Sequence, residues 1–275
     1  MKKMNTLKMI IVFCLLSFLI FALAACGGAK PNGLMEDASP GTSALLFYVY
    51  DGEKTSQTLL FTPDSTDILD KLDAVKATKS NSWSLDDITL PIYGLSIRKK
   101  DGSSIYAAWT NGYWITQAGD VYKFNYDFNK LENNYSSSDR QSFTGISLMP
   151  CACYLTKDKN GWSSALLTPA GELISPNGVT MTLVSWNSDT VSVNIANNSG
   201  ADWIFGEPFS LQVQLDGAWY DIPPAPGNLA FHAIGLVVLS GTQRNKTYGL
   251  EMYGELPAGT YRLVAYGLAV EGTIS

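Results

Sequence analysis

The chain has 275 residues, of which 46% are hydrophobic, and its formal net charge is −6. This apolar content is ordinary for a globular protein, so the composition favours neither a disordered chain nor a bundle of membrane helices. Because the charge is acidic, the sequence offers no electrostatic footprint for nucleic acid, and we expect no nucleic-acid partner.

The first residues combine a basic start with a short apolar run. Met1 to Lys8 carries three lysines and no acid, and the apolar run from Met9 to Leu23 follows. A stable membrane-spanning helix needs about 20 apolar residues, so this run is too short to be one. A basic start, a short apolar stretch and small residues after it are typical of a secretory signal peptide, which predicts that residues 1–25 are removed.

The end of the run, Leu23-Ala24-Ala25-Cys26, resembles the lipobox of bacterial lipoproteins. The resemblance implies that a diacylglyceryl group is attached to the Cys26 thiol and that cleavage makes Cys26 the first mature residue. Two long acyl chains anchor a protein stably, at about 0.8 kcal/mol per buried methylene. We therefore expect a lipid anchor in the cell membrane, with the protein on the extracytoplasmic face. The alternative is an ordinary signal peptide with an unrelated cysteine.

Removal of residues 1–25 takes away three lysines and no acid, which leaves 16 basic and 25 acidic residues and a net charge of −9. An acidic body argues against binding to anionic lipid headgroups other than through the anchor. Residues 26–42 are dominated by glycine, proline and small polar residues. This composition predicts a flexible tether between the lipid and the folded part.

The folded part is predicted to begin with a hairpin and a helix. Residues 44–50 and 57–61 carry strand signals on either side of an Asp51-Gly52 turn. The segment from Asp64 to Lys76 then has apolar residues at helical spacing and acids at its start. This is the clearest helix of the mature chain.

An antiparallel meander is predicted after the helix. Turn signals at Asp101-Gly102, Asn111-Gly112 and Gly119-Asp120 separate short strands rich in aromatic and β-branched residues. A second, short helix is predicted over residues 127–135. One sheet with one or two helices makes residues 43–172 a small α+β domain, and this region resembles no family that we recognise.

The helical signal ends before residue 176, and seven short strands are predicted beyond it, which indicates a β-sandwich at residues 176–275. The strands are expected at residues 179–186, 190–197, 209–215, 219–222, 237–239, 248–253 and 260–266. The predicted fold class of the mature chain is therefore mainly β, with the α+β domain followed by the sandwich.

Three short motifs in the sandwich region are Asp216-Gly217-Ala218-Trp219, Tyr253-Gly254-Glu255-Leu256 and Gly259-Thr260-Tyr261-Arg262. Together they resemble a bacterial immunoglobulin-like domain found in Firmicutes surface lipoproteins. The resemblance implies an immunoglobulin-like fold in which Tyr261 forms a tyrosine corner, with its hydroxyl bonded to the backbone a few residues upstream. The region has no cysteine, so the inter-sheet disulfide of antibody domains is absent.

Met149, Cys151 and Cys153 lie close together in the sequence and form the first candidate site. On a strand, Cα atoms two residues apart are separated by roughly 6.6 Å, so a disulfide between the cysteines would be strained. With Met149 the pair offers three soft sulfur ligands, which Cu(I) favours, whereas nothing nearby completes a zinc site. Core packing of two free thiols, a disulfide and a copper site remain as alternatives.

The aromatic residues of the meander form the second candidate site. Alternation places Tyr122, Phe124 and Tyr126 on one face of a strand, and we expect this face in the core under the helix at 64–76. Four other aromatic residues are predicted ligand contacts that stack on a sugar ring or a protein partner. They are Trp109, Tyr113 and Trp114 beside the Asn111-Gly112 turn, with both tryptophans expected on the surface, and Trp203 at one end of the sandwich.

No catalytic constellation is apparent, and we expect neither an enzyme nor a cofactor. His232 is the only histidine, and its apolar surroundings indicate a structural role, whereas hydrolytic triads need a well-placed imidazole. Aspartates recur every three residues between Asp64 and Asp73. On a helix this spacing drifts around the polar face, so the carboxylates do not converge on one cation.

Three hypotheses for function follow. The favoured one is a membrane-anchored, non-catalytic module that binds a protein or a polysaccharide of the cell envelope. The second is an extracellular small-ligand or copper-binding protein that uses Met149, Cys151 and Cys153. The third, a carboxylate-dependent cell-wall hydrolase, ranks last, because nothing in the sequence singles out the pair of carboxylates that such an enzyme uses.

Overall fold

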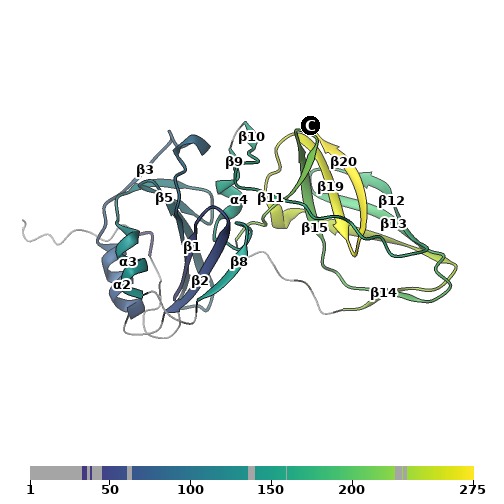
Figure 1. Cartoon of the computed structure of the whole chain (residues 1–275), viewed down its shortest axis with the longest axis horizontal. Helices are drawn as coiled ribbons and strands as arrows, with labels where there is room; N and C mark the ends of the chain where they lie inside the picture. Colours follow the sequence, from purple (N-terminus) through teal and green to yellow (C-terminus); the bar gives the residue numbers. More distant parts are fainter. Residues whose placement is uncertain are drawn as a thin grey trace, which may run out of the picture.

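The computed structural model describes residues 33–35, 38, 45–60, 64–135, 140–158, 160–226, 231 and 234–275. The predicted signal peptide at 1–25, Cys26, most of the predicted tether and His232 lie outside these residues. In the described part of the chain, no helix is long and apolar enough to cross a membrane. Figure 1 shows an N-terminal body with helices on its outer side and a C-terminal body built of strands.

An eight-stranded antiparallel sheet forms the N-terminal body. Its spatial order is β3 (Ala77–Lys79), β7 (Val121–Phe124), β6 (Tyr113–Thr116), β5 (Ser104–Thr110), β4 (Ile92–Arg98), β1 (Leu45–Tyr50), β2 (Lys54–Leu60) and β8 (Gln141–Thr144). The pairing of β1 with β2 confirms the predicted hairpin, and the β5–β6–β7 order confirms the meander. Asn111 and Gly112 both have positive φ, as a tight two-residue hairpin turn requires.

Two helices, α2 (Asp64–Asp73) and α3 (Phe128–Tyr135), cover one face of this sheet (Figure 1). Both were expected, although α2 ends before Lys76. Their apolar residues, among them Ile68 and Phe128, share one buried cluster with the sheet. Met35, in the predicted tether, is only 6% exposed and joins the same cluster, so this part of the tether contacts the N-terminal body.

The other face of the sheet is covered by the chain from Ile146 to Leu155, which includes the short helix α4 (Ala152–Leu155). α4 was not expected from the sequence. A sheet that is covered on both faces needs strands that are apolar on both sides. This explains why β4 is buried at six of its seven positions.

Cys151 and Cys153 are free, buried thiols, and Cys151 belongs to this second core. They are not on a strand, because Cys151 has a φ of 61° at the start of α4 and Cys153 lies within the helix. The strand spacing that made a disulfide strained therefore does not apply to this pair. Burial raises the pKa of both thiols, to about 12 for Cys153.

The C-terminal body contains two larger antiparallel sheets and a small third one. The five-stranded sheet has the order β11 (Thr168–Pro169), β16 (Ala218–Asp221), β15 (Ser210–Leu215), β19 (Gly259–Ala265) and β20 (Leu268–Ile274). The others are β12 (Val179–Trp186), β13 (Thr190–Asn197) and β18 (Thr242–Gly249), and the pair β14 (Trp203–Phe205) and β17 (Leu236–Val238). The mainly β fold class is confirmed.

Two features of this body differ from the prediction. The strand expected at 248–253 is wrong, because β18 spans Thr242–Gly249 and Glu251–Tyr253 is a 3₁₀ turn, η2. β18 is polar and mostly exposed, so its position comes from backbone pairing with β13 along its whole length and not from apolar alternation. The body also begins before residue 176, since β11 pairs with β16.

Tyr261 forms the predicted tyrosine corner. Its side chain is fully buried, and its hydroxyl donates a hydrogen bond to the carbonyl of Pro257, four residues upstream. The same hydroxyl accepts a hydrogen bond of 2.9 Å from Nε1 of Trp162. Trp162 belongs to the hairpin of β9 (Lys157–Asp158) and β10 (Gly161–Trp162), which lies between the two bodies.

Replacement of Tyr261 by phenylalanine removes both hydrogen bonds and leaves two polar partners unsatisfied. We expect the Tyr261→Phe variant to lose about 1–3 kcal/mol of unfolding free energy in urea denaturation. Tyr220→Phe is the matched control, because the Tyr220 ring also packs on the sandwich core but its hydroxyl has no hydrogen-bond partner among the described residues. Equal stability of the two variants would contradict the role of the corner.

The buried thiols predict a pH dependence of stability. Their raised pKa means that folded Cys153 keeps its proton after the unfolded thiol, with a pKa of about 8.5, has lost it. Unfolding then releases a proton, so the unfolding free energy falls as the pH rises above about 8.5. Between about pH 8 and about pH 10, the unfolding free energy of the parent chain should fall. That of Cys153→Ala is expected to fall by roughly 1–2 kcal/mol less. Parallel curves of unfolding free energy against pH would disprove this.

Candidate functional site

A cleft of 490 Å³ opens where the β5–β6 turn faces the chain between β7 and α3. We call it the Tyr93 cleft. Its side chains are chiefly aromatic rings and amides, contributed by Tyr93, Trp109, Asn111, Asn125, Tyr126 and Asn129. A second hollow of 480 Å³ shares Asn111 and Asn125 and adds Tyr113. Two of the predicted contacts, Trp109 and Tyr113, therefore line hollows on either side of one turn.

Contacts inside the protein hold the aromatic rings of the Tyr93 cleft in place. Nε1 of Trp109 donates a hydrogen bond of 2.7 Å to the Phe124 carbonyl, and the Trp109 ring lies 5.0 Å from that of Phe128. The ring of Tyr126 meets Phe128 edge-on at 4.9 Å. Because Nε1 of Trp109 is already hydrogen-bonded inside the protein, Trp109 can contact a ligand only through the face of its ring.

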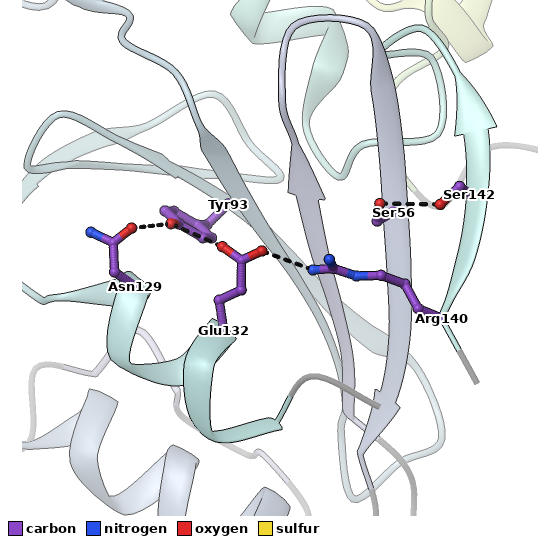
Figure 2. Close-up of polar contacts among 6 residues, drawn as sticks. All are labelled: Ser56, Tyr93, Asn129, Glu132, Arg140 and Ser142. Carbon is purple, nitrogen blue, oxygen red and sulfur yellow. Dashed lines mark hydrogen bonds and ion pairs between the residues drawn. The ribbon is translucent and has the colours of Figure 1, made fainter. Parts of the chain in front are cut away.

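A chain of polar contacts runs behind the cleft (Figure 2). Arg140 donates a hydrogen bond of 3.0 Å to Glu132, whose other oxygen lies 3.4 Å from the Tyr93 hydroxyl. The Tyr93 hydroxyl donates a shorter hydrogen bond, 2.6 Å, to Oδ1 of Asn129. Burial, and then the charge of Glu132, raise the pKa of Tyr93 to about 12, so Tyr93 keeps the proton that this bond needs.

Arg140 directly precedes the edge strand β8, which pairs with β2. Ser142 of β8 lies 3.2 Å from Ser56 of β2, hydroxyl to hydroxyl, and four residue pairs join the two strands (Figure 2). Arg140 is thus attached to the sheet, and the ion pair with Glu132 connects the sheet to α3.

These contacts decide which polar atoms the cleft offers. Oδ1 of Asn129 is occupied by Tyr93, so its Nδ2 group remains as a donor. Nδ2 of Asn111 is bonded to the Asp87 carbonyl at 3.0 Å, so its Oδ1 remains as an acceptor. The Asn125 amide makes no hydrogen bond to any other described residue and offers both groups. The cleft therefore presents donors and acceptors beside aromatic rings.

The expectation that Trp109 and Trp114 are surface residues is wrong for Trp114, which is 1% exposed and packs 4.8 Å from Phe124. The β5–β6 register explains this, because Trp109 and Trp114 are direct partners across the tight turn. Direct partners share one face of a sheet, and here the face is the one that α2 and α3 cover. Trp114 therefore contributes to the core, and Trp109 is half-buried.

The packing of Tyr122, Phe124 and Tyr126 follows the prediction, although β7 ends at Phe124 and Tyr126 lies beyond the strand. Phe124 is fully buried under the helices, and Tyr122 and Tyr126 pack against the same cluster. Trp203, the fourth predicted contact, lies in β14 of the other body, where it stacks on Phe205 at 4.7 Å. The structure does not bring Trp203 to the Tyr93 cleft.

Met149 and Cys151 lie in the second core, and Cys153 is buried within α4. Met149 packs so closely on Gly94 that a Cβ there would be 2.5 Å from its Sδ, and the Cys151 sulfur lies beside the Ala108 backbone. Cysteine binds metals as the thiolate, and burial raises the pKa of both thiols in the metal-free protein. In the part of the chain that the structure describes, no group of three His, Cys, Asp or Glu side chains is placed to hold a metal.

Sequence reasoning missed Tyr93, Asn129, Glu132 and Arg140. Tyr93 in β4 and Arg140 before β8 join the cluster only through tertiary contact. One signal was available, because Asn129 and Glu132 are three residues apart and so lie on the same side of the predicted helix.

A match to a known protein family lies in the C-terminal body. No curated protein and no solved structure matches the chain. Residues 176–267 match the family model of the bacterial Ig-like domain, which supports the immunoglobulin-like domain predicted from the Tyr261 motifs. The match does not reach the N-terminal body or the Tyr93 cleft. In residues 176–267 the chain thus carries a bacterial Ig-like domain, which suggests a surface or interaction module.

Proposed function

We propose that the protein is a lipoprotein on the extracytoplasmic face of the cell membrane and binds a polysaccharide of the envelope without cleaving it. The observation that carries the proposal is the Tyr93 cleft, in which fixed aromatic rings lie beside oriented amides. The lipobox-like segment that ends at Cys26 and the Ig-like module support the location.

The chemistry of the cleft favours a sugar over a charged polymer. A sugar ring offers an apolar face that packs on rings such as Trp109 and Tyr126, and hydroxyls that pair with amides. Among the described residues that line the cleft, none is cationic, and the one acid, Asp127, forms an ion pair with Lys130 at 3.6 Å. A polyanion would meet no counter-charge in this cleft, whereas the second hollow across the turn is lined by Lys76 and Lys123.

The proposal of binding without cleavage rests on the carboxylates. Most glycosidases place two carboxyl groups on either side of the scissile bond. The described lining of the Tyr93 cleft supplies Asp127 alone, since Glu132 is held behind the cleft by Arg140. Hydrolysis would therefore lack either the acid or the base.

Removal of the free amides tests the cleft. We expect the Asn125→Ala/Asn129→Ala variant to bind purified cell walls roughly 5–30-fold more weakly in co-sedimentation, because about two hydrogen bonds are lost. Both side chains are exposed, so the variant should still fold, although loss of the Asn129 oxygen that accepts from Tyr93 is expected to lower the unfolding free energy by about 1 kcal/mol. Asn198→Ala, an exposed asparagine in the Ig-like module, is the matched control. Unchanged binding by the double variant, or release of soluble sugars by the parent chain, would contradict the proposal.

The lipid anchor is tested by metabolic labelling with a fatty acid. The parent chain should incorporate the label and stay in the membrane fraction, and Cys26→Ala should do neither, because its first mature residue has no thiol to acylate. Cys14→Ala is the control and should behave as the parent chain, since Cys14 lies in the segment that is removed. Labelling of Cys26→Ala would refute the anchor.

A further inference from the structure

A larger cleft, of 890 Å³, lies where the N-terminal body, the β9–β10 hairpin and the chain before β19 meet. We call it the inter-body groove. Both bodies contribute to its lining, with Asn81, Trp83 and Tyr154 on one side, Lys157 and Asn160 on the hairpin, and Glu255 on the other side. A hollow of 280 Å³ shares Asn160 and adds Trp162, so the groove continues past the hairpin.

The two walls of the groove are joined by fixed contacts. The ammonium of Lys157 donates to the carbonyls of Tyr253 and Glu255 and lies 5.0 Å from the centre of the Trp162 ring. Trp162 in turn donates to Tyr261. Because the hairpin is tied to the sandwich at both of its strands, the groove is formed before a ligand arrives, and binding costs little ordering.

Aromatic rings line the N-terminal wall. The Tyr154 ring lies flat against the turn at Gly119, where a Cβ would come within 3.0 Å of the ring. The Tyr154 hydroxyl donates to the Gln117 carbonyl at 3.2 Å, so both ends of this side chain are held. Trp83 is half-buried against the second core, and its Nε1 has no hydrogen-bond partner among the described residues.

The polar groups of the groove are suited to hydroxyl groups. The Asn81 amide and the Glu255 carboxylate make no hydrogen bond to other described residues and remain for a ligand. The charges oppose a polyanion, because the described lining carries two acids, Asp158 and Glu255, against one cation, Lys157. A neutral ligand with many hydroxyls meets both acceptors and donors there without a charge penalty.

We propose that the inter-body groove is a second ligand site and that its ligand is a neutral oligosaccharide of several sugar units. The extension past the hairpin favours a chain over a compact molecule, and the rings of Trp83 and Tyr154 favour sugars. This site is separate from the Tyr93 cleft and goes beyond the function proposed above.

The test is a calorimetric titration of the processed chain carrying Cys26→Ser, which removes only the lipid. The Asn125→Ala/Asn129→Ala background is used, so that the Tyr93 cleft does not contribute. The probes are the β-1,4-linked tetramers of N-acetylglucosamine and of glucose, with poly(glycerol phosphate) as the polyanion. We expect saturable binding of at least one tetramer and none of the polyanion.

Addition of Asn81→Ala and Glu255→Ala to that background should weaken tetramer binding at least about tenfold, since two hydrogen-bonding groups are lost. Both side chains are exposed, so thermal unfolding should be unchanged. Asn198→Ala again serves as the control. The inference is overturned if neither tetramer binds, if the polyanion binds more tightly than the tetramers, or if the Asn81 and Glu255 changes leave the affinity intact.

Discussion

The hydroxyl of Tyr261 is the contact on which the arrangement of the protein depends. It donates to the Pro257 carbonyl within its own domain and accepts from Trp162 of the hairpin between the bodies. An immunoglobulin-like domain needs only the first bond to close its corner. The second bond, together with Lys157, connects this corner to the hairpin that forms one wall of the inter-body groove. A fold-stabilising residue thus also holds the hairpin that lines the groove.

A buried tyrosine has the corresponding role in the N-terminal body. Tyr93 is held by burial and by Glu132, and through Asn129 it decides which end of an amide faces the cleft. The amide of Asn111 is oriented by a backbone carbonyl in the same way. Groups whose orientation is fixed in the free protein lose little entropy when they bind, which suits recognition of a weakly interacting ligand such as a sugar.

The sequence was informative where local patterns decide the structure. Turn signals identified the meander, helical spacing identified α2, and the residues around Tyr261 identified the corner. It failed where tertiary contact overrides pattern. Trp114 looked exposed beside its turn but is buried by its register with Trp109, and β18 is a strand only because β13 pairs with it. The Tyr93 network joins β4, α3 and Arg140, which no local pattern connects.

The most direct test of the account is a nuclear magnetic resonance titration of the side-chain amides with solubilised wall polysaccharide. The account predicts that the signals of Asn111, Asn125 and Asn129 shift together and saturate, because these amides are the polar contacts of the Tyr93 cleft. Amides of the Ig-like module that lie away from both clefts, such as Asn198, should not move. Shifts confined to the Ig-like module, or none at all, would contradict the assignment of the binding site.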